Sequence, residues 1–591
     1  MPEFEARAPI EEPMKRFAFI VLIIASTLCY ADDSRMSKDL KRSTAPTVRV
    51  IVQYRQAPAS SDLHRLGRLG VVRHSLPLLN GVVAELSPAR IAELSDDANV
   101  KYISPDRALR PTLSNAAPAI NAFAAWQSGF TGAGIGVAVI DSGISSHPDL
   151  NGGFLGQSRV VWSQSFVTGD LTTADAFGHG THVAGLIAGD GASSTGSKYS
   201  KTFEGIAPGA NLINLRVLDE NGEGTDSTVI QAINAAISLK LLFNIRVINL
   251  SLGREVFESY KLDPLCQAVE LAWTNGIVVV VSAGNNGRAQ LTGGYGTVTA
   301  PGNDPYVITV GAMKPMGTPT RVDDLIASYS SKGPTAGDAV VKPDVVAPGN
   351  MLVSLESANS SLYNAFPTNR VPYSFYQNGG SSASSSTYFT LSGTSMAAAV
   401  VSGAVADMLQ KTPGLTPDQV KARLMKTAWK SLPSDSTYLD PVAGVTYNDQ
   451  YDIFTVGAGY VDLEAALANT DLAKGTAMSP IATFDSTTGS VSMQDDPSAV
   501  WNTSATWSNA AVWGTAQFTE TNAAASASSS ASTSASSADS SNNALWGGNA
   551  LWGGNALWGG NALWGGNALW GGNALWGGNA LWGGSIPTGE N

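Results

Sequence analysis

Short apolar runs alternate with longer helical patterns between residues 119 and 469. Residues 228–242 and 263–275 have helical patterns, and the runs around them are apolar or β-branched, as in strands buried on both faces of a parallel sheet. These runs cover residues 135–140, 211–217, 247–252 and 277–281. The βαβα order predicts a doubly wound, mostly parallel α/β domain over residues 118–470. We expect catalytic residues of such a domain at the carboxyl ends of its strands.

A smaller α/β pattern precedes this domain, at residues 45–111. Residues 48–54 alternate between apolar and polar positions like a strand, and residues 82–86 and 100–103 predict two more strands. Residues 88–94 predict a short helix with Ser87 as its cap. The segment is therefore expected to fold as a small α/β unit. It either works together with the domain that follows or is an unrelated N-terminal domain.

The chain changes character after residue 470. Residues 523–542 are nearly all Ala, Ser, Thr and Asn, and we predict a Ser/Ala-rich linker over residues 471–542. Residues 543–584 then repeat Asn-Ala-Leu-Trp-Gly-Gly seven times without a change, and this array carries no ionisable group. The same spacing of six separates three earlier tryptophans in less regular copies: Trp501, Trp507 and Trp513.

The repeats allow three interpretations. Hexads can stack as rungs of a parallel solenoid, Gly-Gly-Asn can form turns in a chain without a fold, or the tryptophans can form an exposed interaction patch. We favour the second and third interpretations over the solenoid. The tail is then expected to bind a surface, a polymer or other copies of itself.

Residues 14–31 have the features of an export signal. A short basic region (14–16) precedes an apolar run (17–28) that is too short to span a bilayer comfortably. Cys29 and Ala31 then place small residues where a signal peptidase cuts. We predict a signal peptide and a secreted or cell-surface protein, with acylation of Cys29 in a lipoprotein as the alternative.

Composition excludes some classes of function. Charged residues make up 14% of the chain and the net charge is −12, so no basic surface for nucleic acid or anionic lipid is expected. Hydrophobic residues make up 43%, which is enough for a large core. Besides Cys29 the chain has only Cys266, so an exported chain that has lost its signal cannot form an internal disulfide.

Three segments carry residue types that nucleophilic catalysis needs. Asp141 ends a predicted buried strand, where a carboxylate shielded from water can orient a histidine. His179 lies between two glycines that allow close approach of other backbone. Ser395 stands where a loop enters a helix, and a helix N-terminus favours developing negative charge. Taken singly, each has an alternative: a turn residue for Asp141, a zinc ligand together with His182 or a structural residue for His179, and a helix cap for Ser395.

The three segments together resemble the subtilisin-like serine proteases (subtilases, peptidase family S8). They read V-A-V-I-D-S-G, G-H-G-T-H-V-A-G and L-S-G-T-S-M-A-A-A, and residues 145–150, 205–209, 328–334 and 345–349 match the family as well. The resemblance implies a catalytic triad of Asp141, His179 and Ser395 that cuts peptide bonds through an acyl-enzyme. It also implies that Asn285, in V-S-A-G-N-N-G, is the side-chain donor of the oxyanion hole.

The resemblance further implies how substrates and the N-terminal segment bind. An extended protein or peptide substrate would pair with one strand and an opposing edge, made by Ser251, Leu252 and Gly253 on one side and by Gly222 and Gly224 on the other. Residues 45–111 resemble the inhibitor propeptide of the family, which the enzyme would remove from its own precursor. Residues 351–390 form a longer insert that either covers the cleft or lies on the surface.

The expected chemistry requires no cofactor. Asp149 matches a calcium-ligand position of some relatives, but residues 190–203 replace the loop that supplies their other ligands, so a structural calcium is left open. Two other classes of function compete with an active peptidase. One is an assembly protein in which the Trp-rich tail is the main feature, and the other is an inactive subtilase kept as a binding module. The complete triad and Asn285 favour the active enzyme.

Overall fold

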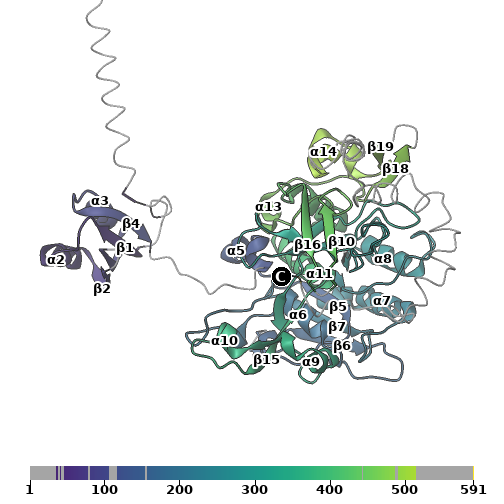
Figure 1. The fold of residues 1–591 in the computed structure, drawn as a ribbon, viewed down its shortest axis with the longest axis horizontal. Helices are drawn as coiled ribbons and strands as arrows, with labels where there is room; N and C mark the ends of the chain where they lie inside the picture. The colour runs from purple at the N-terminus through teal and green to yellow at the C-terminus, as the bar shows by residue number, and fades with distance from the viewer. Residues whose placement is uncertain are drawn as a thin grey trace, which may run out of the picture. The chain divides into compact units, whose positions relative to one another are not determined.

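The structure, a computed structural model, describes residues 35–36, 40, 46–77, 80–105, 116–152, 156–441, 443–485, 490–513 and 590. It divides into two compact units between Arg110 and Pro111 (Figure 1). The predicted signal peptide (14–31) and the hexapeptide repeats (543–584) lie outside the described residues. Within the described ranges, no helix is long and apolar enough to cross a membrane.

The first unit contains a four-stranded antiparallel sheet in the order β2-β3-β1-β4. The predicted strands and helix are confirmed as β1 (Val48–Tyr54), β3 (Gly81–Leu86), β4 (Val100–Pro105) and α3 (Pro88–Ser95). Ser87 is the N-cap residue of α3, but its side chain makes no capping hydrogen bond. The sequence pattern did not indicate α2 (Ser60–Leu69) and β2 (Val71–Leu76). The unit has a hydrophobic core of its own, which includes Val50, Val52, Leu66, Val82, Ile91 and Val100.

The second unit is built around an eight-stranded sheet. Its order is β11-β10-β9-β8-β5-β7-β6, with β12 paired to β10, and all neighbours are parallel except β10 and β11. The predicted strands are β5 (Gly136–Asp141), β7 (Asn211–Arg216), β8 (Ile245–Leu250) and β9 (Val278–Ser282). The others are β6 (Val160–Ser165), β10 (Ile308–Lys314), β11 (Leu325–Ile326) and β12 (Val345–Pro348). The prediction of a mostly parallel α/β domain is confirmed.

Two pairs of helices pack on this sheet. α6 (His179–Ala188) and α11 (Thr394–Lys411) contact each other, and α7 (Asp226–Phe243) and α8 (Pro264–Thr274) contact each other. α6 is buried over its whole length, and α11 packs over β8, β9 and β10 (Figure 1). The burial of α6 and α11 follows from their small and apolar residues, which let the helices lie close to the strands. Cys266, on α8, is buried and free.

The insert at residues 351–390 folds into a small antiparallel sheet. Its strands are β13 (Leu352–Leu355), β14 (Arg370–Pro372) and β15 (Ser384–Leu391), in the order β13-β15-β14. α9 (Ser361–Ala365) and α10 (Tyr373–Tyr376) lie between them in sequence. β13 packs against α6, and the hydroxyl of Ser354 donates to the carbonyl oxygen of His182 at 2.8 Å. The insert therefore supports the helix that begins at His179.

The chain does not become a linker at residue 471. β18 (Ile481–Asp485) and β19 (Ser490–Gln494) form a hairpin, followed by the short helices η7 (Val500–Asn502), η8 (Ala505–Trp507) and α14 (Asn509–Trp513). Trp501, Trp507 and Trp513 are only 2%, 5% and 1% exposed, and α14 packs against α12 (Pro417–Thr427). The linker prediction is wrong for the described part of residues 471–513, because the tryptophans spaced by six belong to the core. Residues 514–542 lie outside the described residues.

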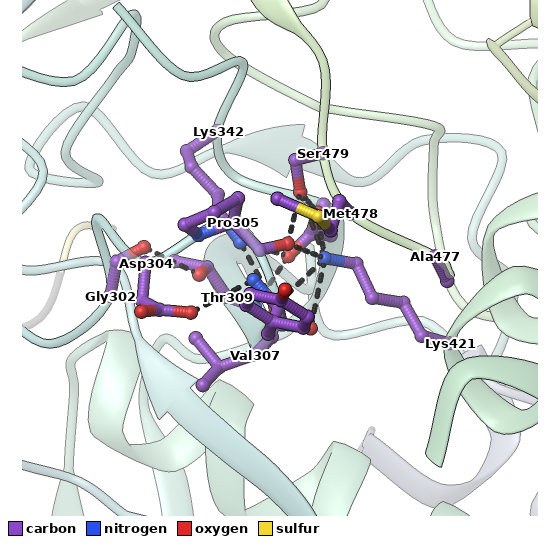
Figure 2. A network of polar contacts seen from close by, with 12 residues as sticks. Gly302, Asp304, Pro305, Val307, Thr309, Lys342, Lys421, Ala477, Met478 and Ser479 are labelled. Atoms are coloured by element: carbon purple, nitrogen blue, oxygen red, sulfur yellow. Dashed lines mark hydrogen bonds and ion pairs between the residues drawn. The ribbon is translucent and has the colours of Figure 1, made fainter. Parts of the chain in front are cut away.

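A buried ionic network joins this extension to the sheet (Figure 2). The ammonium groups of Lys342 and Lys421 lie 2.7 and 3.1 Å from the carboxylate of Asp344, and the hydroxyl of Ser479 donates to the same carboxylate at 2.5 Å. Lys421 also donates to the carbonyl oxygen of Pro305 at 2.7 Å. Burial lowers the pKa of Lys421 to about 7 despite the nearby carboxylate. Since Lys421 belongs to α12 and Ser479 to the extension, the network holds both segments against the strand β12 that follows Asp344.

Candidate active site

Asp141 is the last residue of the central strand β5 and is fully buried. Its Oδ1 lies 2.7 Å from Nδ1 of His179 and also accepts the backbone N–H of Ser142 at 2.7 Å. A Cβ added to Gly180 would collide with the carbonyl oxygen of Gly143, so this close approach requires the glycine that follows His179. The carboxylate keeps the imidazole proton on Nδ1 and leaves Nε2 as the basic nitrogen.

His179 is the first residue of α6 and is also fully buried. Burial alone would lower the pKa of His179, but the charge and the hydrogen bond of Asp141 raise it above its usual value. Among the described residues, none forms a hydrogen bond with the buried Nε2 atom of His179. An imidazole that is oriented at one nitrogen and open at the other is suited to general base catalysis.

Asp175 positions His179, and the sequence patterns did not reveal it. Its Oδ1 accepts the N–H of Gly178 at 2.6 Å and the hydroxyl of Ser142 at 2.8 Å, and its Oδ2 accepts the N–H of Thr181 at 2.7 Å. These bonds satisfy free N–H groups at the start of α6 and tie the helix to the loop that follows β5. The one sequence signal for this role is an acidic residue shortly before a helix start.

Ser395 is the second residue of α11 and is 1% exposed. Its hydroxyl donates to the carbonyl oxygen of Ser251 at 3.1 Å, and the hydroxyl of Ser251 donates to the carbonyl oxygen of Ser395 at 2.9 Å. α11 packs against α6, the helix that begins at His179. The two helices thus bring the predicted base and nucleophile into one region, with the Ser395 hydroxyl directed at Ser251.

Asn285 follows β9 and is held by Thr394, the residue before Ser395. The N–H and the hydroxyl of Thr394 both donate to Oδ1 of Asn285, at 2.9 and 3.1 Å. Because an N–H group can only donate, the atom that faces Thr394 must be the amide oxygen, and Nδ2 is directed elsewhere. The amide of Asn285 is therefore held with a fixed orientation beside the start of α11, which carries Ser395.

Comparison with known proteins gives the family of this chain. The subtilase family profile matches residues 132–461. Serine protease AprX of Bacillus subtilis (strain 168) is 37% identical over 358 residues, which are 58% of this chain and 73% of AprX. Subtilisin E of the same organism is 32% identical over 460 residues, which are 76% of this chain and 98% of subtilisin E. The chain belongs to the subtilase family.

This subtilase is therefore a serine-type endopeptidase, and its substrates are proteins or peptides. The matched residues 132–461 contain Asp141, His179, Ser395 and Asn285. An alkaline protease of Alkalihalobacillus alcalophilus is 33% identical over 368 residues, which are 62% of this chain and 77% of that protein. The family resemblance inferred from the motifs is confirmed.

The predicted substrate-binding segments adjoin the predicted catalytic residues of the subtilase. Ser251, which contacts Ser395, directly follows β8 and continues into Leu252 and Gly253. Gly222 has a φ of +79°, and a Cβ added to it would lie 2.7 Å from the ring of Phe177, which stands 6.5 Å from the imidazole of His179. A Cβ added to Gly224 would lie 2.7 Å from the carbonyl oxygen of Val217. One segment thus lies beside the predicted nucleophile and the other beside the predicted base.

His182 has a structural environment. Its Nε2 lies 3.1 Å from the carbonyl oxygens of both Leu352 and Phe389, to which only a protonated nitrogen can donate. Burial, together with the neighbouring His179, lowers the pKa of His182 to about 3 and keeps it neutral. In the described part of the chain, no group of three or more His, Cys, Asp and Glu side chains is placed to hold a metal ion.

The carboxylate of Asp149, the candidate calcium ligand, is held by hydrogen bonds. It is fully buried, and its two carboxylate oxygens accept the backbone N–H of Ser193 at 2.8 Å and the hydroxyl of Tyr388 at 2.7 Å. The hydroxyl of Tyr388 comes from β15 of the insert, so both oxygens of this carboxylate have hydrogen-bond partners. A structural calcium, at Asp149 or elsewhere in the chain, stays a hypothesis.

Proposed function

We propose that this subtilase is a secreted endopeptidase that cuts peptide bonds through Asp141, His179 and Ser395, with an acyl-enzyme intermediate. The observation that carries the proposal is the buried hydrogen bond of 2.7 Å between Asp141 and His179. It lies at the carboxyl end of β5 and next to the packed pair of α6 and α11. A buried carboxylate that orients a buried imidazole supports proton transfer to and from a nearby hydroxyl.

In the proposed reaction, the hydroxyl of Ser395 leaves the carbonyl oxygen of Ser251 and attacks the carbonyl carbon of the scissile bond. Nε2 of His179 takes the hydroxyl proton and then gives it to the departing amine. Asp141 stabilises the imidazolium that forms in between. Water hydrolyses the resulting ester by the same proton route, which releases the second product and restores Ser395.

Two N–H donors would bind the oxyanion of the tetrahedral intermediate. One is Nδ2 of Asn285, whose amide is oriented by Thr394. The other is the backbone N–H of Ser395, near the start of α11, where the positive end of the helix dipole favours negative charge. Because Asn285 is held in place before substrate binds, little reorganisation accompanies the formation of the oxyanion.

The substrate would bind as an added strand. Residues 251–253 would pair with one edge of the peptide and Gly222 and Gly224 would border the other, close to the predicted nucleophile and base. Main-chain hydrogen bonds do not depend on side-chain identity, so this mode supports cleavage of many sequences. Side-chain pockets would then set the preference at individual positions.

The flanking segments would govern maturation and location. Residues 14–31 would direct export, and residues 45–111 would serve as a propeptide that assists folding, inhibits the enzyme and is removed by it. The separate core of the first unit supports folding of that segment as a domain. The repeats at 543–584 would attach the enzyme to a surface, to a polymer or to other copies of itself.

Replacement of the nucleophile tests the proposal. Ser395→Ala should lower kcat on a peptide substrate by about 10⁶ while the circular dichroism spectrum stays unchanged, because the triad acts as a unit. Ser238→Ala, at an exposed position of α7, is the matched control and should keep full activity. Near-normal hydrolysis by Ser395→Ala would refute the role of Ser395. N-terminal sequencing should show residues 45–111 still attached in the Ser395→Ala chain, and a normal mature end would refute self-processing.

A further inference from the structure

Glu590 is buried in the second unit, from here on called the catalytic unit because it contains the proposed active site. The residues that form the pocket around it lie far from it in sequence. Glu590 is 2% exposed, and its Oε1 accepts the backbone N–H of Ser328 at 3.0 Å and a guanidinium N–H of Arg288 at 2.9 Å. The hydroxyl of Ser328 donates to the same oxygen. Asn350 binds the backbone of Glu590 at two points, because its Nδ2 donates to the carbonyl oxygen at 2.7 Å and its Oδ1 accepts the N–H at 2.9 Å.

The charges of the pocket require a carboxylate at this position. Lys314 is 5% exposed, and within the described ranges the only carboxylate within 4 Å of its ammonium group is that of Glu590, at 3.7 Å. Arg288 pairs with both Glu590 and Asp440, at 2.9 and 3.0 Å. Two cations against the single carboxylate of Asp440 would leave one buried positive charge without a counter-ion, which is costly. Glu590 supplies that counter-ion.

Aromatic side chains of a hairpin complete the pocket. The hairpin consists of β16 (Asp435–Leu439) and β17 (Thr446–Gln450). The rings of Tyr438 and Tyr447 each lie 5.2 Å from the guanidinium carbon of Arg288, and the ring of Tyr438 also lies 4.8 Å from the ammonium of Lys314. Aromatic rings at these distances stabilise the cations through their π faces. The cations are therefore held in place to receive an anionic side chain.

The pocket adjoins both loops that carry the proposed catalytic donors. Arg288 follows Asn285 by three positions in the same loop. Asn350 stands between Gly349, whose carbonyl oxygen accepts the N–H of Gly393 at 2.8 Å, and Met351, whose N–H donates to the hydroxyl of Ser392 at 2.9 Å. A residue bound here therefore contacts a segment that is hydrogen-bonded to Ser392 and Gly393, which directly precede α11 and Ser395.

We propose that this pocket is a docking site for Glu590 of the same chain, which fastens the far end of the repeat segment to the catalytic unit. On the other side of the repeats, the described chain up to Trp513 packs on the same unit through the buried side chain of Trp513. The ligand is a glutamate within a peptide, recognised by its carboxylate through Arg288 and Ser328 and by its backbone through Asn350. The docking does not depend on catalysis, so it can be tested in an inactive enzyme.

Hydrogen exchange at the amide of Ser328 tests the docking in the full chain. In a Ser395→Ala background, where the precursor stays intact, Glu590→Ala should speed exchange of this amide by about tenfold or more, because it loses a bond to a charged acceptor. Glu258→Gln, at an exposed position of the same unit, should leave the exchange rate unchanged. An exchange rate that is the same in Glu590→Ala and in its parent would overturn the proposal.

A peptide added in trans identifies the ligand. In a Ser395→Ala chain that ends at Gly584, the peptide Ser-Ile-Pro-Thr-Gly-Glu-Asn should restore slow exchange of Ser328, and the same peptide with Gln in place of Glu should do so at least tenfold less well. Equal protection by the two peptides would overturn the role of the carboxylate. A third outcome is that the peptide slows exchange of the Ser328 amide although Glu590→Ala has no effect in the full chain. It would mean that the pocket takes acidic peptides from other proteins, and it would overturn the assignment to Glu590.

Discussion

Replacement of Trp501 should show that the extension after residue 470 is part of the catalytic unit. The Trp501 side chain is 2% exposed, its indole N–H donates to the carbonyl oxygen of Met478 at 2.7 Å, and its ring meets that of Trp513 edge to face at a centroid distance of 5.0 Å. Truncation of a buried tryptophan to alanine costs about 3–5 kcal/mol. The aromatic pair accounts for about 0.5–1.5 kcal/mol of this cost.

The assay is urea unfolding followed by circular dichroism in a Ser395→Ala background, which prevents self-digestion during the measurement. Trp501→Ala should lower the free energy of unfolding by about 3–5 kcal/mol. Trp162→Ala is the matched control, because Trp162 is 39% exposed on β6, and it should cost about 1 kcal/mol or less. A double-mutant cycle with Trp513→Ala should give a coupling energy of about 0.5–1.5 kcal/mol.

The reasoning is refuted if Trp501→Ala costs no more than Trp162→Ala. In that case the extension would be a dispensable addition, as the linker prediction from composition assumed. The packing of α14 on α12 instead predicts that removal of the extension destabilises the chain. A chain that ends near residue 470 should be destabilised, whereas a chain that ends at residue 513 should keep the contacts of Trp501.

Three further outcomes are expected. Asn285→Ala should lower kcat by about 10²–10³ with little change in KM, because the amide acts on the oxyanion; an unchanged kcat would remove Asn285 from the site. Burial raises the pKa of Glu356 to about 8 from an ordinary value of 4.5, so the folded state binds this proton more tightly and loses stability as the pH rises through that interval. The urea midpoint of Glu356→Gln should therefore exceed that of the parent by more at pH 9 than at pH 5, and a pH-independent difference would contradict this. EDTA should not lower the thermal midpoint of the Ser395→Ala chain through Asp149, so it should change the midpoint equally with and without Asp149→Asn. A drop that Asp149→Asn abolishes would show that a cation binds there.

The parallel strands and the residues at their carboxyl ends could be predicted because local sequence patterns encode both. β5, β8 and β9 are buried on both faces, so each appears in the sequence as an almost uninterrupted apolar run. Asp141 and His179 stand at the ends of elements, and Gly180 is required by the close approach of their backbones. The sequence features that indicate each of these residues lie within a few positions of it, so they can be recognised in a single sequence.

Contacts between distant segments could not be predicted in this way. Asp175 is one acidic residue in a polar loop, and its role depends on hydrogen bonds to Ser142 and to the start of α6. The spacing of Trp501 and Trp513 indicated a repeat, but their burial depends on the surface of α12. Glu590 meets Arg288 across 302 positions, and no local period or composition reports such a partner.

The role of Ser395 is tested most directly by mapping the site at which a serine-directed fluorophosphonate reacts. The purified mature enzyme is labelled, digested and analysed by mass spectrometry while casein hydrolysis is followed in parallel. One adduct on Ser395, with loss of hydrolysis in proportion to labelling, is the predicted result, and His179→Ala should prevent the adduct because the hydroxyl then lacks its base. Hydrolysis that continues when Ser395 is fully labelled, or inactivation through an adduct on another serine, would contradict the proposed triad.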